Sequence, residues 1–219
     1  MRAKAARQRV ARLRAPSRRA FLRRTAPVST RWGKDRGTGI DRYYIERFLE
    51  RHQADVRGAV LEVKDSGYTE RFGTGVARRE VVDIDAANER ATIVADLGQG
   101  LGAEWERTFD CFILTQTLQY LFEPRGAIES AFRVLKPGGA LLVTVPFISR
   151  WPTDPPPLTD YWRFTPPGCE TLFAASFGEE NVDVEVAGNV LTASAFLYGL
   201  ACEDLDRRRL DENDPSYPV

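Results

Sequence analysis

A chain of 219 residues with 43% hydrophobic content is long enough to bury one good core, and two full domains are not expected. Its 31 basic and 31 acidic residues give a formal net charge of zero. The charges are unevenly spread, because residues 1–34 hold twelve Arg or Lys and no acid, and the rest carries a net charge of −12. Such an acidic body excludes binding of a phosphate backbone across its surface, so no nucleic-acid partner is expected.

The basic arm, residues 1–34, is predicted to be flexible or partly helical, and residues 35–219 to form the folded domain. The arm has the charge to contact nucleic acid, anionic lipid or an acidic partner, or it is a solvated extension without a ligand. No apolar run approaches the roughly 20 residues of a membrane span, and no apolar core follows the basic start as in a secretory signal. We therefore expect a cytoplasmic protein without a transmembrane segment, with an organelle transit peptide as the alternative.

The three cysteines, Cys111, Cys169 and Cys202, are widely spaced and form no C-x-x-C motif. Neither a disulfide framework nor a metal site is predicted from them. Cys111 lies inside an apolar run and is expected to be a small core residue.

Apolar segments with strand character alternate with helical patterns along the chain. The predicted strands are residues 59–63, 80–85, 91–95, 109–114, 140–145 and 181–186. The predicted helices are residues 41–49, 127–135, 171–177 and 191–205. This alternation predicts an α/β fold, with a Rossmann-like, doubly wound and mostly parallel sheet. A dinucleotide-binding oxidoreductase domain shares the same early pattern and is the alternative fold.

The stretch from Phe109 to Pro146 is the most informative part of the chain. It reads as a buried strand, an amphipathic helix, the turn Lys136-Pro137-Gly138-Gly139 and a second buried strand. Proline cannot continue a helix and the glycines tolerate positive φ, so the turn is expected to end the helix. Two parallel strands joined by a helix are the unit of an open α/β sheet, whose ligands bind at the carboxyl ends of the strands.

The loop after the first predicted strand, residues 64–69, contains only one glycine, Gly67. The G-x-G-x-x-G fingerprint of dinucleotide binders is therefore absent, which favours a ligand without phosphates over a nicotinamide cofactor. An ordinary turn without a ligand is the alternative.

Acidic residues end the next two predicted strands. Asp85, rather than Asp83, is the candidate to accept both hydroxyls of a ribose, and Asp96 the candidate to accept the exocyclic amine of an adenine. Leu97 is expected to pack against the ring. Solvated acids near a loop are the alternative interpretation. Thr115 and Gln116 follow the fourth strand, where the reacting group should lie, and are expected to contact a cofactor tail or line the acceptor pocket.

Five motifs in this order resemble the class I S-adenosylmethionine-dependent methyltransferases, and the pattern is type 11-like. They are VLEV–KDSGYT, VVDID, ATIVADL, FDCFILTQTLQYL and RVLKPGGALLVTVP. With GIDRYYIERFL and DYWRFT, the pattern is similar to a bacterial subgroup often associated with glycosyltransferases and polysaccharide assembly. The resemblance covers roughly residues 30–219 and implies S-adenosylmethionine as the cofactor.

The resemblance also implies a cofactor site, residue by residue. Its members are Glu62 in the first motif, Lys64, Gly67 and Tyr68 in the loop, Asp85, Asp96, Leu97, Thr115 and Gln116. Two departures from the family pattern stand out. Lys64 and Ser66 occupy glycine positions of the first loop, and the last strand of the family's seven-stranded sheet, expected near residues 217–219, is very short or missing.

Methyl transfer to a hydroxyl benefits from a base near the acceptor's proton, and the candidates lie after the fifth strand. They are Asp154, Asp160 and Arg163, beside the aromatic residues Tyr161 and Trp162, which can stack on sugars. The alternative is a structural cover in which Trp162 and Phe164 cap the core and Asp160 pairs with Arg163. The only histidine, His52, lies at the end of a helix away from this region and is not assigned a catalytic role.

The sequence therefore predicts methyl transfer from S-adenosylmethionine to a small-molecule or saccharide acceptor, through a hydroxyl oxygen. A non-catalytic binding or scaffolding protein with a degenerate cofactor loop is the second hypothesis, and a nicotinamide-dependent oxidoreductase the third. The acceptor, the methylated atom and the oligomeric state do not follow from the sequence.

Overall fold

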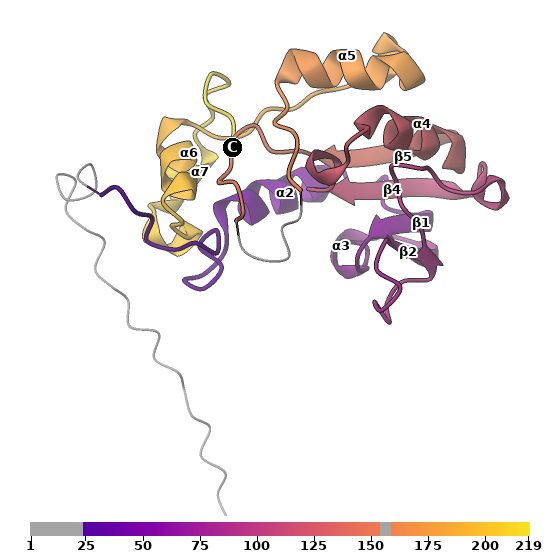
Figure 1. Ribbon diagram of the computed structural model, residues 1–219. Helices are drawn as coiled ribbons and strands as arrows, with labels where there is room; N and C mark the ends of the chain where they lie inside the picture. The colour runs from indigo at the N-terminus through magenta and orange to yellow at the C-terminus, as the bar shows by residue number, and fades with distance from the viewer. Residues whose placement is uncertain (1–23, 154–158) are drawn as a thin grey trace, which may run out of the picture.

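The computed structural model describes residues 24–153 and 159–219 and contains a five-stranded, all-parallel sheet with strand order β3-β2-β1-β4-β5 (Figure 1). The strands are β1 Gly58–Val63, β2 Val76–Asp83, β3 Ile93–Val94, β4 Phe109–Thr115 and β5 Leu135–Thr144. The predicted doubly wound α/β fold is confirmed. The order reverses between β1 and β4, which makes the carboxyl ends of these two strands the topological switch point of the sheet.

Six α-helices accompany the sheet in the described residues. They are α2 Ile40–Arg51, α3 Gly67–Phe72, α4 Pro124–Val134, α5 Pro166–Phe177, α6 Val190–Leu197 and α7 Arg207–Asp211. The predicted helices at residues 41–49, 127–135 and 171–177 are thus found as α2, α4 and α5. Thr165 caps α5 by accepting from the Gly168 amide, which lets that helix begin five residues earlier than its apolar pattern indicates.

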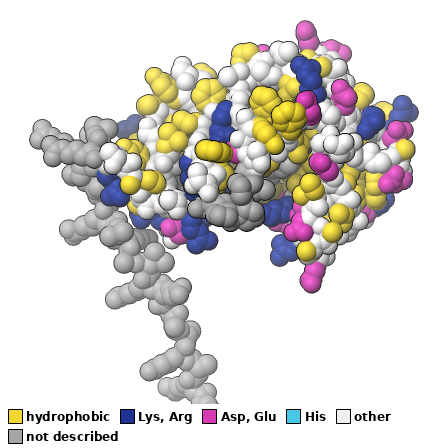
Figure 2. All heavy atoms as spheres, in the orientation of Figure 1, with side chains coloured by type: hydrophobic (Ala, Val, Ile, Leu, Met, Phe, Trp, Pro, Cys, Tyr) yellow, Lys and Arg dark blue, Asp and Glu magenta, His cyan; other side chains and the backbone are white. Residues whose placement is uncertain are grey.

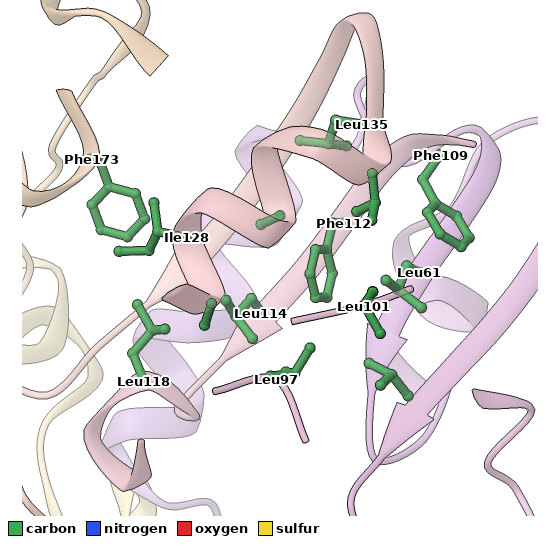
Figure 3. Packing of buried hydrophobic residues seen from close by; sticks show 14 of the residues in the cluster. Leu61, Leu97, Leu101, Phe109, Phe112, Leu114, Leu118, Ile128, Leu135 and Phe173 are labelled. Carbon is green, nitrogen blue, oxygen red and sulfur yellow. The ribbon is translucent and has the colours of Figure 1, made fainter. Parts of the chain in front are cut away.

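Each face of the sheet packs against its own helices, because neighbouring strand residues point to opposite sides. On one face Leu61, Phe112 and Leu114 pack with Ile128 of α4 and Phe173 of α5, as the close view in Figure 3 shows. On the other face the buried strand residues pack against α2. They are Val60, Cys111, Ile113 and Leu142, in contact with a cluster that includes Ile45 and Leu49. Cys111 is a fully buried core residue, as expected.

The Lys136–Gly139 turn lies inside β5 rather than between helix and strand. Helix α4 ends at Val134, and Leu135 already pairs with Phe109, whereas Ala140 pairs with Cys111. The shift in register accommodates the extra residues as a bulge, with Gly138 at φ +77°. A side chain at Gly139 would meet the backbone oxygens of Lys136, Asp110 and Phe109 at 3.0–3.2 Å, so both glycines are needed here.

The predicted strand at residues 181–186 is not a strand. Val182 and Val184 pack against the core, so the apolar alternation is real, but no described strand pairs with this extended segment. In Figure 1 it runs back beneath α5 toward α6. Residues 217–219, where the last strand was predicted to be very short or missing, form no strand, and there the Val219 amide makes one backbone bond, to the Ala187 oxygen, at 3.0 Å.

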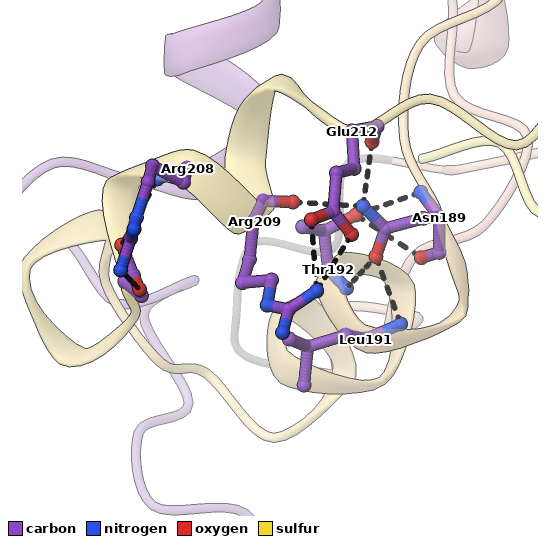
Figure 4. Close-up of polar contacts among 7 residues, drawn as sticks. Asn189, Leu191, Thr192, Arg208, Arg209 and Glu212 are labelled. Atoms are coloured by element: carbon purple, nitrogen blue, oxygen red, sulfur yellow. Dashed lines mark hydrogen bonds and ion pairs between the residues drawn. The ribbon is translucent and has the colours of Figure 1, made fainter.

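The predicted helix at residues 191–205 is shorter than expected. Helix α6 begins after Asn189, whose side chain accepts from the Leu191 and Thr192 amides in a capping box (Figure 4). It ends before Gly199, which has φ +69° and lies against the Ser29 backbone with no room for a side chain. The chain therefore turns there instead of continuing the helix.

Asp154 and residues 1–23 of the predicted basic arm lie outside the described residues. The following part of the arm contacts the domain, since the Val28 amide donates to the Tyr198 oxygen at 2.7 Å. Acidic and basic side chains are interspersed on the face drawn in Figure 2. Within the part of the chain that the structure describes, no helix is long and apolar enough to cross a membrane.

Candidate cofactor site at the switch point

Two non-glycine residues with left-handed backbone mark the switch point. Lys64 directly follows β1 with φ +75°, and Gln116 directly follows β4 with φ +47°. Their amides remain in the sheet, donating to the oxygens of Val82 and Thr144 at 2.9 and 2.8 Å. Left-handed backbone costs non-glycine residues roughly 1–2 kcal/mol each. Such strain tends to persist where the surrounding structure fixes it, and functional sites are a common place for it.

Glu62 orders the loop after β1. Its side chain is 3% exposed and accepts hydrogen bonds from the amides of Tyr68 and Thr69 and from the Thr69 hydroxyl, at 2.7–3.0 Å. Burial raises the pKa of Glu62 although these bonds act in the opposite direction. The carboxylate thus holds the first turn of α3, a helix that the sequence analysis leaves as a loop. Gly67 is that helix's first residue.

The acidic residues after β2 and β3 have different surroundings. Asp83 accepts from the Asp85 amide and from Asn88 Nδ2, which makes it part of the turn. The exposed Asp85 uses Oδ1 to accept from the Ala87 amide, and Asp96 uses Oδ1 to accept from the Gly98 amide. Each of these two carboxylates has its second oxygen without a hydrogen bond to a described residue. Leu97 is 6% exposed and belongs to the core.

Two basic residues, Arg42 in the first turn of α2 and Lys34 before that helix, lie near the first loop, and sequence reasoning missed them. Arg42 Nη1 donates to the Tyr68 hydroxyl at 2.6 Å. Lys34 is close enough to Arg42 and Lys64 that their charges, together with partial burial as the main cause, lower its pKa. In the sequence, only Lys64, which stands where the family pattern has a glycine, indicated that the first loop carries positive charge. These residues bring positive charge to the first loop at the switch point.

The loop after β4 connects the switch point to the candidate acceptor residues. The side chain of Gln119 is 3% exposed, lies 3.4 Å from Gln116 Oε1 and keeps its own Oε1 without a hydrogen-bond partner in the described chain. Its backbone oxygen accepts from the Tyr161 amide at 2.7 Å. Residues 160–163 are therefore held beside this loop.

Asp160 and Arg163 form an ion pair. Both Asp160 oxygens accept from the guanidinium, the Nη2–Oδ2 distance being 2.8 Å, and the Asp160 side chain is 4% exposed. Trp162 Nε1 donates to the Leu121 oxygen at 2.8 Å, while its ring is 41% exposed. Phe164 packs against the core. This cluster has the pairing expected of a structural cover, and it also presents the exposed rings of Tyr161 and Trp162 that an acceptor could stack on.

Tyr120 is a further polar group in this region that the sequence analysis did not single out. Burial, with a smaller contribution from the negative charge of Asp160, raises the pKa of its hydroxyl, which stays protonated at neutral pH. His52 lies elsewhere, with Nε2 2.8 Å from Glu185 Oε1.

Comparisons with known proteins find similar domains and folds. The family model described as "Methyltransferase domain" matches residues 74–143, the part of the chain from β2 to β5. The match includes Asp85, Asp96 and Gln116, and it begins after the altered first loop. No curated protein matches the sequence significantly.

Among solved structures, the [4+2]-cyclase SpnF is similar with a TM-score of 0.51 and 18% identity, over 77% of this chain and 67% of that one. The N-methyltransferase NodS from Bradyrhizobium japonicum WM9, in complex with S-adenosylhomocysteine, has 18% identity over 57% and 69% of the two chains, with a TM-score of 0.39. A Burkholderia thailandensis N1-methyltransferase of 1,6-didemethyltoxoflavin has 17% identity over 64% and 68%, with a TM-score of 0.46. The first of these likenesses supports the fold. The chain thus has the Rossmann-like α/β fold of the class I methyltransferases, and its residues 74–143 match a methyltransferase domain.

Proposed function

We propose that this protein transfers the methyl group of S-adenosylmethionine to a small-molecule or saccharide acceptor, at a hydroxyl oxygen. The observation that carries the proposal is the pair of left-handed residues, Lys64 and Gln116, directly after β1 and β4. They lie where open α/β sheets bind ligands, inside a chain whose β2–β5 region matches a methyltransferase domain.

The residues at the switch point fit the cofactor. Asp85 and Asp96 each have a carboxylate oxygen without a described partner, suited to a ribose hydroxyl and an adenine amine respectively. Arg42 and Lys34 supply positive charge for the carboxylate of the methionine part. Lys64 already has the backbone conformation that a glycine at its position would favour, so its side chain does not prevent the loop from adopting the required shape.

Bound S-adenosylmethionine supplies an activated methyl group on a sulfonium centre. The protein's part is to position the acceptor in line with that group and to exclude water. Gln116 and Gln119, which carry no charge, are suited to this positioning by hydrogen bonds. Asp160, Arg163 and Asp154 are proposed to act on the acceptor, with Asp160 taking up the hydroxyl proton or orienting the hydroxyl.

A saccharide acceptor is favoured by the exposed aromatic rings beside this cluster. Tyr161 is 46% exposed and lies edge-on to Phe122, with ring centroids 5.5 Å apart. Aromatic faces and paired charged groups are suited to the apolar faces and hydroxyls of sugars. Association with a glycosyltransferase is a proposal that rests on the sequence resemblance, and a cytoplasmic location is a proposal that rests on the signal and cysteine pattern of the sequence.

The second candidate function is a non-catalytic binding protein with this fold. The loop after β1 favours this function, because Lys64 and Ser66 stand there in place of two glycines of the family pattern. The two candidates differ in whether the switch point binds the cofactor.

Thermal unfolding with added S-adenosylmethionine, S-adenosylhomocysteine or NAD separates these functions. We expect both adenosyl compounds to raise the midpoint and NAD to leave it unchanged. Absence of any shift supports the binding protein and contradicts the proposed activity. After binding is confirmed, mass spectrometry on a panel of sugars is expected to show products heavier by one methylene group.

A further inference from the structure

Four exposed aromatic rings belong to the segments around the candidate acceptor residues. Trp151 is 68% exposed and Phe122 is 65% exposed, while Tyr161 and Trp162 are 46% and 41% exposed. The ring centroids of Phe122 and Tyr161 lie 5.5 Å apart, and Trp162 Nε1 donates to the oxygen of Leu121, the residue before Phe122. Large apolar groups gathered on one exposed surface mark an interaction site more often than rings scattered singly.

Basic residues join these rings through the loop after β5. Arg163 Nη2 donates to the Arg150 oxygen at 3.4 Å, which brings the neighbouring Trp151 beside the acceptor residues. The Arg150 guanidinium lies over the Trp32 ring, 4.7 Å from its centroid, and donates to the Thr30 oxygen. The segment before α2, the loop after β5 and the acceptor residues thus form one continuous surface.

The segment before α2 is held firmly in this surface. Trp32 Nε1 donates to Ser149 Oγ at 3.1 Å, and Lys34 Nζ lies 5.8 Å from the centroid of the same ring. Trp32 and Gly33 both have left-handed backbone, with φ +54° and +76°, and a Cβ at Gly33 would lie 2.5 Å from the Leu200 oxygen. In Figure 1 this indigo segment runs beside α6 before it enters α2. Its basic side chains are therefore presented from a closely packed backbone.

The surface and the chain that precedes it carry positive charge. Arg31 and Lys34 are exposed, whereas Asp35 accepts a side-chain hydrogen bond and Asp160 is ion-paired. Residues 1–23, outside the described residues, precede this segment and contain nine Arg or Lys and no acidic residue. The side chains drawn next to the start of the grey chain in Figure 2 are mainly basic or hydrophobic. The partner that matches this surface is therefore anionic.

We propose that this aromatic–basic surface binds the headgroup region of a membrane that contains anionic lipids. Indole and phenol rings are favoured at the boundary between headgroups and acyl chains, and Arg and Lys are attracted to anionic headgroups. Apolar contact and a polybasic segment together bind a membrane more firmly than either alone. A nucleic-acid duplex would use only the basic residues and leave the rings in water. The surface consists of Arg31, Trp32, Lys34, Phe122, Arg150, Trp151, Tyr161 and Trp162.

The test uses the whole protein and two kinds of vesicle, one of phosphatidylcholine alone and one with about a third of phosphatidylglycerol. Binding is measured by flotation of the vesicles through a density gradient. We expect at least about tenfold tighter binding to the anionic vesicles, and we expect added salt to weaken it. Vesicles with brominated acyl chains should quench the tryptophan fluorescence of the protein, because exposed indoles reach the acyl boundary.

Trp151→Ala tests the contribution of the aromatic rings. We expect this variant to bind anionic vesicles about fivefold more weakly and to show less quenching by brominated chains. Phe132→Ala is the matched control, because it removes a ring that is 49% exposed on α4, outside the surface. Its binding should equal that of the unchanged protein, and circular dichroism should show both variants folded.

Arg31→Gln tests the contribution of charge within the described part of the surface. Loss of one basic residue near an anionic membrane is expected to weaken binding about fivefold. Arg90→Gln is the matched control, since the Arg90 side chain is 75% exposed and lies outside the surface. That variant should bind like the unchanged protein.

Three results overturn the proposal. The first is equal binding, or no binding, to the two kinds of vesicle, and the second is that the Trp151 and Arg31 variants bind like their matched controls. The third is tighter binding of a single-stranded oligothymidine that the same substitutions weaken, which would assign the surface to nucleic acid. None of these readouts depends on methyl transfer, so they leave the proposed function untouched.

Discussion

Lys64 and Gln116 are the first residues after two neighbouring parallel strands, and both have a left-handed backbone. Their strands lie side by side at the reversal of strand order, so the two strained positions flank the same crevice. Both amides still bond within the sheet, which keeps the strands in register up to the strained residues. These two strained positions thus lie at the edge where the cofactor is proposed to bind.

Substitution of Lys64 by glycine is expected to stabilise the protein by up to about 1 kcal/mol. Relief of left-handed strain, roughly 1–2 kcal/mol, exceeds the roughly 0.4–1 kcal/mol that glycine's flexibility adds to the unfolded chain. Lys64→Ala is the matched control and should give no such gain, because alanine keeps the strain. Urea unfolding of the three proteins measures the effect, and equal gains from glycine and alanine would show that the backbone conformation is not the cause.

Substitution of Asp85 by alanine is expected to weaken S-adenosylhomocysteine binding at least about tenfold, through loss of a charged acceptor for the ribose. Stability should change little, because Asp85 is exposed. Glu89→Ala, the loss of a nearby exposed acid, should leave affinity unchanged. Isothermal titration calorimetry gives the comparison, and an Asp85 variant with native affinity would refute the ribose assignment.

Glu62→Gln is expected to cost about 1–3 kcal/mol of stability, because an amide group replaces one acceptor oxygen that faces amide donors. The pKa of Glu62 is raised in the folded protein, so the folded state holds this proton more tightly than the unfolded one. Glu62 ionisation therefore lowers wild-type stability as pH rises from the ordinary value of 4.5 through the raised one.

The cost of Glu62→Gln should thus be larger at pH 4 than at pH 8, since the glutamine does not titrate. Urea titrations at both values measure it. A cost that grows with pH would show that the pKa of Glu62 is lowered on folding instead.

The Asp160–Arg163 pair should behave as one unit. Removal of either partner leaves the other charge without its bidentate contact, and each of Asp160→Asn and Arg163→Met is expected to cost about 2–4 kcal/mol. The double variant should cost less than the sum. Additive costs in a double-mutant cycle would mean that the pair contributes no coupling energy to stability.

The cysteine thiols are expected to be unreactive in the folded protein. Burial raises the pKa of Cys111 to about 12, that of Cys169 to about 11 and that of Cys202 to about 12. Because the unfolded thiols ionise near 9, stability should fall as pH rises above that value. Thiol titration at pH 8 should label all three only after denaturant is added, and rapid labelling of native protein would contradict this burial.

The sequence was sufficient for the parts of the fold whose residues bury apolar surface in a regular period. Strand β4 is buried on both faces, through Phe112 on one and Ile113 on the other, so its apolar run predicts a strand directly. Alternation at Val182 and Val184 predicts burial correctly but not pairing, because a strand also needs a neighbour with free backbone groups.

Candidate site residues could be named from the sequence only where a residue type has one evident use, as with acids at strand ends, and these assignments stay predictions. The contact between Arg42 and Tyr68 joins residues 26 positions apart and depends on how α2 packs over the first loop. The left-handed backbone of Gln116 arises where β4 passes into the following loop, and no pattern in the sequence predicts it. Tertiary geometry of this kind is set by packing across the sheet.

The two edges of the sheet differ in a way that bears on handling of the protein. β3 has two residues and offers almost no template for another chain, whereas β5 has ten. A long strand edge with apolar side chains on both faces is a known nucleus for association between like molecules. Concentrated preparations should therefore lose monomer first through the β5 side.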